Sequence, residues 1–315
     1  FSNNSKELLN HRELFATLKL VLHTMWADQV QHVLCMFLGG IEMSEFSNWQ
    51  GYLVSSTENC FIISSPWSLS DRVVFGPDSD YNTLAVSLVQ YMYSHGIEIE
   101  SLQCENSQLE MDFLNLALGF DESISTSEWQ IFCSDDAIVC ISNSLDKKFS
   151  KPENLIQVDE SKYNLIKEAW EKEAALENVS QGAYVSTQQY SESLSSRINL
   201  MAQSGNQSIW PPRILNEQGE YYGSQSIRLS NICNIESWTK LSAAGAPSEF
   251  SIRAPILGGI STAYVSFEEG TKGVFLLVDD EDTSPEIGSK GEIVVRRIYG
   301  QEGQIRYGTK LRIID

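Results

Sequence analysis

The chain has 315 residues, which is enough for two domains of ordinary size, each with its own hydrophobic core. Its 42 acidic and 22 basic residues give a formal net charge of −20, which argues against nucleic acid as a partner, because the phosphate backbone is also negative. No apolar run reaches the roughly 18 residues of a membrane-spanning helix, so we expect no membrane insertion.

The first half of the chain alternates between helix and strand patterns. Residues 6–38 carry apolar side chains at helical spacing. A second helix is predicted over 84–95, with Asp80 or Asn82 as its N-cap, and a third over 107–118; each is followed by a glycine. Strand alternation is found at 51–65, 71–76, 97–104, 128–132 and 137–142. This order predicts a mixed α+β domain.

The second half changes from a charged helix to strands. A polar connector begins near residue 145, and the segment 163–178 that follows it suits a helix with i,i+4 ion pairs. From residue 226 onward, apolar and polar side chains alternate between glycine-containing turns, which predicts a small closed barrel or sandwich. The strand patterns lie at 226–235, 236–243, 260–267, 274–280, 292–300 and 304–314.

Five segments of the second half occur in an order that is found in a known family. They are YVSTQQYSESLSSRINL (184–200), IWPPR (209–213), RAPILGGISTAYVSFEEGTKGVFLLVDD (253–280), IGSKGEIVVRRI (287–298) and IRYGTKLRI (305–313). Together they resemble the zinc-ribbon/OB-fold proteins that accompany acyl-CoA enzymes, the domain-of-unknown-function family thirty-five. The element order predicts an α+β domain at 1–150 and a linker and helix at 151–182, and the resemblance implies a helix and degenerate zinc-ribbon segment at 183–225 and an all-β OB-fold barrel at 226–315.

The family also implies a function. Its members bind thiolases, hydroxymethylglutaryl-CoA synthases or thiolase-like enzymes, and they help to hold or pass acyl-CoA between partners. The resemblance therefore implies a non-catalytic accessory subunit of an acyl-CoA-processing complex. Its partner would be a thiolase-superfamily enzyme, acyl-CoA or CoA would be a shared ligand, and no cofactor would be tightly bound.

The sequence departs from the family at the zinc ligands. In the family, one CxxC pair precedes the PPR segment and a second follows it, and the four thiolates bind zinc. The corresponding positions here fall near Ala202, Gly205, Asn216 and Gly219, whose side chains cannot bind the metal. We therefore expect a degenerate zinc ribbon that holds no zinc.

One candidate ligand site is the segment Trp210, Pro211, Pro212 and Arg213. It combines a rigid turn, an aromatic plate and a guanidinium, which suit the adenine ring or a phosphate of CoA. In the alternative interpretation, Trp210 packs on the barrel and Arg213 pairs with one of the many acidic residues.

A second candidate is a basic cluster near the end of the chain. Arg296 and Arg306 are its proposed ligand-binding members, and alternation places Arg296 and Arg297 on opposite faces of a strand. The remaining members are Lys310 and Arg312. The cluster indicates either a surface for phosphate or an acidic partner, or a solvated strand face.

The first domain has a separate resemblance. Asn106 and the LGF turn at 118–120 stand where the GCN5-related N-acetyltransferase fold has an Asn and a similar turn. The CoA-binding turn of that fold would correspond to GPDSDYNT at 76–83, in which Asp78 and Asp80 would repel phosphate. We expect a degenerate acetyltransferase-like scaffold, with a CoA-dependent N-acyltransferase as the alternative function.

No motif assigns a catalytic residue. GxSxG, Walker and HExxH patterns do not occur, and the six cysteines include no CxxC pair. Dispersed cysteines are typical of free thiols in a reducing compartment, so we expect a cytoplasmic protein. A nucleic-acid-binding OB-fold is a further alternative, against which the acidic charge argues.

Overall fold

The computed structural model describes residues 45–104, 108–120, 127–144, 149–179, 186–204, 208–212, 226–280 and 284–314. Its contacts divide the chain into two units, Phe1–Ser44 and Glu45–Asp315, and all of the described residues belong to the second. The helix that we predict over 6–38 lies outside the described residues, as do Asn106, Arg213, Gly205, Asn216 and Gly219.

Within the described residues, six strands form one sheet in the order β1-β2-β3-β8-β7-β6. Neighbouring strands are antiparallel except β6 and β7, which are parallel. The strands are β1 (Ser47–Trp49), β2 (Tyr52–Ser56), β3 (Cys60–Ser64), β6 (Gln103–Cys104), β7 (Gln130–Cys133) and β8 (Ile138–Ser142). The mixed α+β region predicted from the sequence is therefore confirmed.

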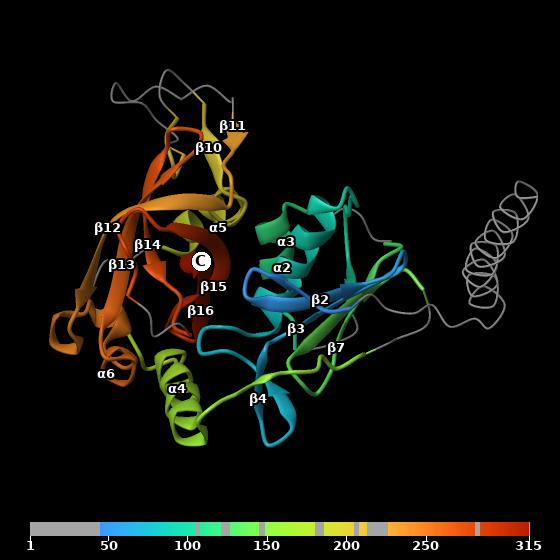
Figure 1. Cartoon of the computed structure of the whole chain (residues 1–315), viewed down its shortest axis with the longest axis horizontal. Helices are drawn as coiled ribbons and strands as arrows, with labels where there is room; N and C mark the ends of the chain where they lie inside the picture. Colours follow the sequence, from blue (N-terminus) through green and yellow to red (C-terminus); the bar gives the residue numbers. More distant parts are fainter. Residues whose placement is uncertain are drawn as a thin grey trace, which may run out of the picture. The chain divides into compact units, whose positions relative to one another are not determined.

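Two helices, α2 (Tyr81–Ser94) and α3 (Met111–Leu118), pack together against this sheet (Figure 1). Asp80 is the N-cap of α2, as one of the two predicted alternatives required, and its side chain accepts from the backbone N–H of Thr83. The Thr83 hydroxyl in turn accepts a hydrogen bond from the backbone N–H of Asp80, which completes a capping box. Gly119 ends α3 with φ 72°, a left-handed conformation that glycine adopts at little cost.

Five strands of the described chain close into a barrel in the order β12-β13-β14-β16-β15 (Figure 1). All pairs are antiparallel except β14 and β16, which are parallel. The strands are β12 (Ile232–Leu241), β13 (Ile260–Phe267), β14 (Lys272–Leu277), β15 (Lys290–Gln301) and β16 (Gln304–Ile314). The predicted small barrel is confirmed.

One boundary in the barrel differs from the sequence pattern. We predict a break near residue 235, but β12 runs through it and shifts register between Ile235 and Ser237. Such a bulge changes the alternation of side chains without ending the strand. The separate strand β11 (Ser226–Arg228) pairs instead with β10 (Met201–Gln203).

The segments between sheet and barrel supply two helices, α4 (Glu160–Glu173) and α5 (Thr187–Ile198). Leu194 and Ile198 of α5 join the core under the sheet. A three-stranded sheet contains β4 (Trp67–Leu69), β5 (Arg72–Val74) and β9 (Ile156–Gln157). Short helical turns η1 (Ala243–Gly245), η2 (Ser248–Phe250) and α6 (Ala254–Leu257) connect β12 to β13.

The sheet and the barrel share a core. Val295 and Tyr307 of the barrel are buried in the same apolar cluster as the residues of α2 and α3. The Tyr307 hydroxyl donates to Asp80 at 2.9 Å and accepts from the Asn82 amide at 2.8 Å. These two hydrogen bonds fix the start of α2 against β16.

Candidate functional site

A cleft with a volume of about 690 Å³ lies where three segments of the chain meet. Its walls come from the segment 67–80 that leads into α2, from 157–174 including α4, and from the barrel. This volume falls within the range of small-molecule sites, roughly 300–1,000 Å³. The lining residues include Trp67, Phe75, Tyr163, Ile166, Trp170 and Arg297.

Aromatic side chains form much of the cleft wall. Trp170 is 3% exposed, and its indole N–H donates to the carbonyl of Pro77 at 2.6 Å. The guanidinium carbons of Arg253 and Arg297 lie 3.8 and 4.2 Å from the Trp170 ring centre. Cation–π contacts of this kind hold the ring in one orientation. These contacts therefore fix the Trp170 ring in the cleft wall.

The charges around the cleft are mainly acidic. Its described lining contains five carboxylates against three basic side chains, which are Asp80, Asp159, Glu171, Asp279 and Asp280 against Lys162, Lys167 and Arg297. Like charges repel strongly at short range in a partly buried site. An apolar, largely uncharged group suits these walls better than a chain of phosphates does.

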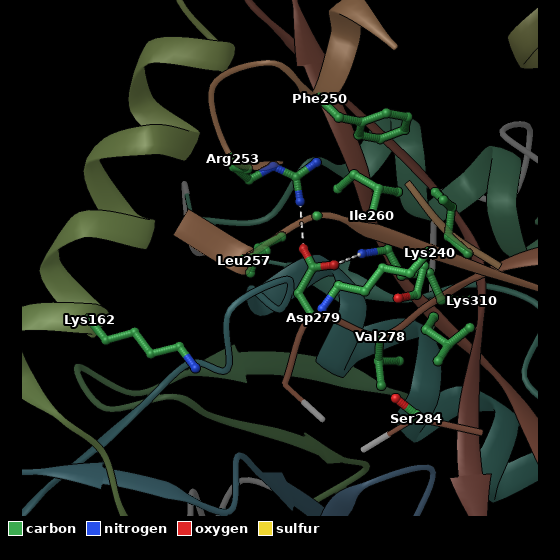
Figure 2. A pocket seen from close by; sticks show the side chains of 14 residues that line it. Lys162, Lys240, Phe250, Arg253, Leu257, Ile260, Val278, Asp279, Ser284 and Lys310 are labelled. Atoms are coloured by element: carbon green, nitrogen blue, oxygen red, sulfur yellow. Dashed lines mark hydrogen bonds and ion pairs between the residues drawn. The ribbon is translucent and has the colours of Figure 1, made fainter. Parts of the chain in front are cut away.

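A second, smaller cavity of about 80 Å³ adjoins the cleft, and the two share Lys162 and Asp279 as walls. We call it the basic pocket because Lys162, Lys240, Arg253 and Lys310 line it together with one carboxylate, Asp279. Figure 2 shows Lys162 extending from α4 on one side, whereas Lys240 and Lys310 belong to the barrel. Ser261 and Ser284 add hydroxyl groups to the lining.

Three of the residues that line the basic pocket, Arg253, Asp279 and Lys310, also belong to a buried ion-pair network. Arg253 donates through Nε to both carboxylate oxygens of Glu173 at 2.9 Å, and through Nη1 to Asp279 at 2.5 Å. Lys310 Nζ lies 2.8 Å from Asp279 and 2.8 Å from Asp78. These pairs connect α4, the segment before α2 and the barrel.

The far end of the ion-pair network is Asp78. Its side chain is fully buried, 3.5 Å from Arg296 Nε, and it accepts from the backbone N–H of Asp279 at 3.0 Å. Burial alone would raise the pKa of Asp78, but Lys310 and Arg296 outweigh burial and hold this pKa below its ordinary value. At Glu173 burial outweighs Arg253, so the pKa of Glu173 lies above its ordinary value.

The turn at 76–83 is where an acetyltransferase would bind the CoA pyrophosphate. Here the first turn of α2 is already capped by the carboxylate of Asp80, which accepts the Thr83 N–H. Asp78 is turned inward to Lys310 and Arg296. The Asp80 carboxylate therefore occupies the helix N-terminus, where a phosphate would bind in the acetyltransferase-like interpretation.

Those predicted site residues that the structure describes lie in different environments. Trp210 is half-buried and stacks on Phe275 of the barrel, with ring centres 4.8 Å apart and planes 24° apart. Pro211 and Pro212 follow it and are also half-buried. This arrangement corresponds to the packing interpretation of Trp210. Arg213 lies outside the described residues.

The basic cluster is divided among different environments. Arg296, which we expected on a strand face open to phosphate or solvent, is instead fully buried, because Asp78, the Gln50 carbonyl and the Tyr52 ring surround it. Arg306 lies 4.6 Å from the Tyr190 ring centre, away from the cleft lining. The other members separate as well: Arg297 lines the cleft, Lys310 lines the basic pocket, and Arg312 pairs with Glu292 at 3.4 Å.

Sequence reasoning did not identify the cleft residues. Trp67 and Trp170 are more than a hundred residues apart in the sequence, and no periodic pattern connects them or Phe75. The available signal was compositional: aromatic residues flank the Gly76–Pro77 turn, and Trp170 is the single tryptophan of a charged helix.

No family model matches this chain, and no curated protein matches it. Across the described ranges, no helix is both long and apolar enough to span a membrane. The same residues contain no group of three or more His, Cys, Asp or Glu side chains placed to bind a metal ion. Of the four positions that correspond to zinc ligands, Ala202 is described, and it is buried in β10.

Proposed function

We propose that this protein is an accessory subunit that binds a thiolase-superfamily enzyme and holds the acyl part of an acyl-CoA in the cleft. The observation that carries the proposal is the cleft itself, about 690 Å³ in volume with aromatic residues in its lining. The partner class comes from the resemblance of 182–315 to the zinc-ribbon/OB-fold proteins. A closed five-stranded barrel within the described residues is compatible with an OB-like fold.

The apolar wall favours the acyl chain over the nucleotide. Moving one methylene group from water to an apolar site stabilises binding by about 0.8 kcal/mol, which is roughly fourfold in affinity. The acidic lining opposes the phosphates of CoA, so these would lie outside the cleft. In this arrangement the protein recognises the acyl group and leaves the CoA portion accessible to the partner enzyme.

The cleft part of the proposal is tested by narrowing the cleft. Val158 is half-buried in its wall, and Val158→Trp should fill space without changing charge. Binding of an eight-carbon acyl-CoA, measured by calorimetry, should weaken at least tenfold. The matched control is Val274→Trp on β14, where the side chain is 64% exposed and outside the cleft, and it should bind as the wild type does. Equal binding by both variants would contradict the proposal.

The partner is tested by affinity purification of the tagged chain from its native cell extract, with mass spectrometry of what co-purifies. We expect a thiolase-like enzyme in near-equal molar amount, and reconstitution from the two purified proteins should give the same complex by size-exclusion chromatography. A chain that stays monomeric with every such enzyme of its source would contradict the partner assignment.

A further inference from the structure

We propose that Cys60 and Cys140 are a redox-active pair, which a small disulfide oxidises to an intramolecular disulfide that cross-links strands β3 and β8. The two residues are 80 positions apart in the sequence, yet their Sγ atoms lie 3.5 Å apart. Both are thiols in the structure. The pair is independent of the proposed function, because neither cysteine lines the cleft.

The pairing of β3 with β8 brings the two sulfur atoms together. The strands are antiparallel, and Cys140 is opposite Ile62, two residues along β3 from Cys60. Side chains two positions apart on a strand share a face of the sheet, so the two cysteines are diagonal neighbours on one face. Phe61, which lies between Cys60 and Ile62, is in the core with residues of α2 and α3, so the cysteines belong to the opposite face.

The observed separation leaves little movement for bond formation. The S–S bond of a disulfide is about 2.05 Å long, so the two sulfur atoms need to approach by about 1.5 Å. Cys60 is the first residue of β3 and follows an exposed turn at Glu58 and Asn59, whereas Cys140 lies in the middle of β8. Because strand ends open more easily than the middle of a sheet, movement at Cys60 can supply this approach.

The same difference determines which thiol reacts first. Both side chains are buried, but Cys60 is 6% exposed and Cys140 is 0% exposed. When the turn before β3 opens, Cys60 loses its proton and attacks one sulfur of the small disulfide, which forms a mixed disulfide and releases one thiol. Cys140 then loses its proton and attacks the Cys60 sulfur, which completes the cross-link and releases the second thiol. Two electrons and two protons thus pass to the oxidant, which ends as two thiols.

The cross-link should stabilise the fold. It closes a loop of about 80 residues that contains both α2 and α3. In the chain-entropy account, a disulfide that closes a loop of this length stabilises a protein by restricting its unfolded chain. For a chain of 315 residues, we expect the melting temperature of the oxidised form to be higher by roughly 6 °C.

The experiment oxidises the full chain at low protein concentration with bis(2-hydroxyethyl) disulfide, which is small enough to reach a thiol at a strand end. The reaction is quenched with acid, the remaining thiols are blocked with N-ethylmaleimide, and a non-reducing digest is analysed by mass spectrometry. Most molecules should contain the peptide pair that is joined through Cys60 and Cys140. The oxidised form should also melt roughly 6 °C higher than the reduced form, and dithiothreitol should reverse both changes.

Two variants separate this pair from the other cysteines. Cys60→Ala removes one member, and its melting temperature should not change on oxidation. The matched control Cys233→Ala removes a buried cysteine of β12, and it should keep both the linked peptides and the rise in melting temperature.

The digest of the wild type decides the proposal even where a variant does not fold. Absence of the linked peptides, or a disulfide that joins two other cysteines instead, would refute the pair. A linked chain that melts no higher than the reduced chain, or a Cys60→Ala variant that shows the same rise, would refute the stabilising cross-link.

Discussion

The ion-pair network predicts a large loss of stability for Asp78→Ala. The carboxylate is fully buried and is bound to Lys310 at 2.8 Å, to Arg296 at 3.5 Å and to a backbone N–H at 3.0 Å. Removing one partner of a buried ion pair costs about 3–5 kcal/mol, because the other charge stays buried without compensation. Lys310 retains Asp279 at 2.8 Å, so we expect the lower end, about 3 kcal/mol.

The assay is thermal unfolding followed by circular dichroism at neutral pH. A loss of about 3 kcal/mol corresponds to a fall in melting temperature of roughly 5 °C for a chain of 315 residues, because the entropy of unfolding is about 2.1 cal/mol/K per residue. The matched control is Glu236→Ala, which removes a carboxylate from a surface pair with Lys272 at 2.7 Å. That pair is screened by solvent, so the control should melt close to the wild type.

The same reasoning predicts coupling within the ion-pair network. Lys310→Met should cost less in the Asp78→Ala background than in the wild type, since the lysine has already lost one of its two carboxylates. A fall in melting temperature no larger for Asp78→Ala than for Glu236→Ala would refute the argument. Strict additivity of Asp78→Ala and Lys310→Met would refute it equally.

Three further predictions concern the barrel, α4 and pH. Trp210→Ala should destabilise by about 2 kcal/mol in chemical denaturation, below the value for a fully buried tryptophan, because Trp210 is half-buried on Phe275. A Cβ at Gly300 would stand 2.8 Å from the backbone of α4, so Gly300→Ala should lower the melting temperature, whereas Gly245→Ala, whose nearest neighbour is 3.7 Å away, should not. Because the pKa of Asp78 is lowered in the folded state, the ionised carboxylate stabilises the fold above about pH 4, and this contribution is lost as the pH falls further. The free energy of unfolding of Asp78→Asn should therefore decrease less steeply below pH 4 than that of the wild type.

Local patterns predicted most of the elements, although the strand predicted over 97–104 forms only at Gln103–Cys104. The cap of α2 at Asp80 and the end of α3 at Gly119 follow from side-chain chemistry within four residues. The limits of β13 and β16 coincide with the alternating segments, since one face of each strand packs in the barrel core. These features depend on neighbours along the chain, which the sequence displays directly.

The site depends on contacts that the sequence does not display. Alternation places Arg296 on one face of β15, but it cannot say that Asp78, more than two hundred residues earlier, covers that face. Trp67 and Trp170 are likewise brought to one cleft only by the packing of α4. In an isolated turn, the Asp78 carboxylate would repel phosphate. In the fold, it is buried and pairs with Lys310 and Arg296.

The central claim is that the cleft holds an acyl chain, and the most direct measurement is calorimetry of the full chain with saturated acyl-CoAs of four, six, eight and ten carbons. Each added pair of methylenes should tighten binding by about fifteenfold until the cleft is filled, from about 0.8 kcal/mol per methylene. Affinities that do not change with chain length, or that equal the affinity of CoA alone, would contradict the account.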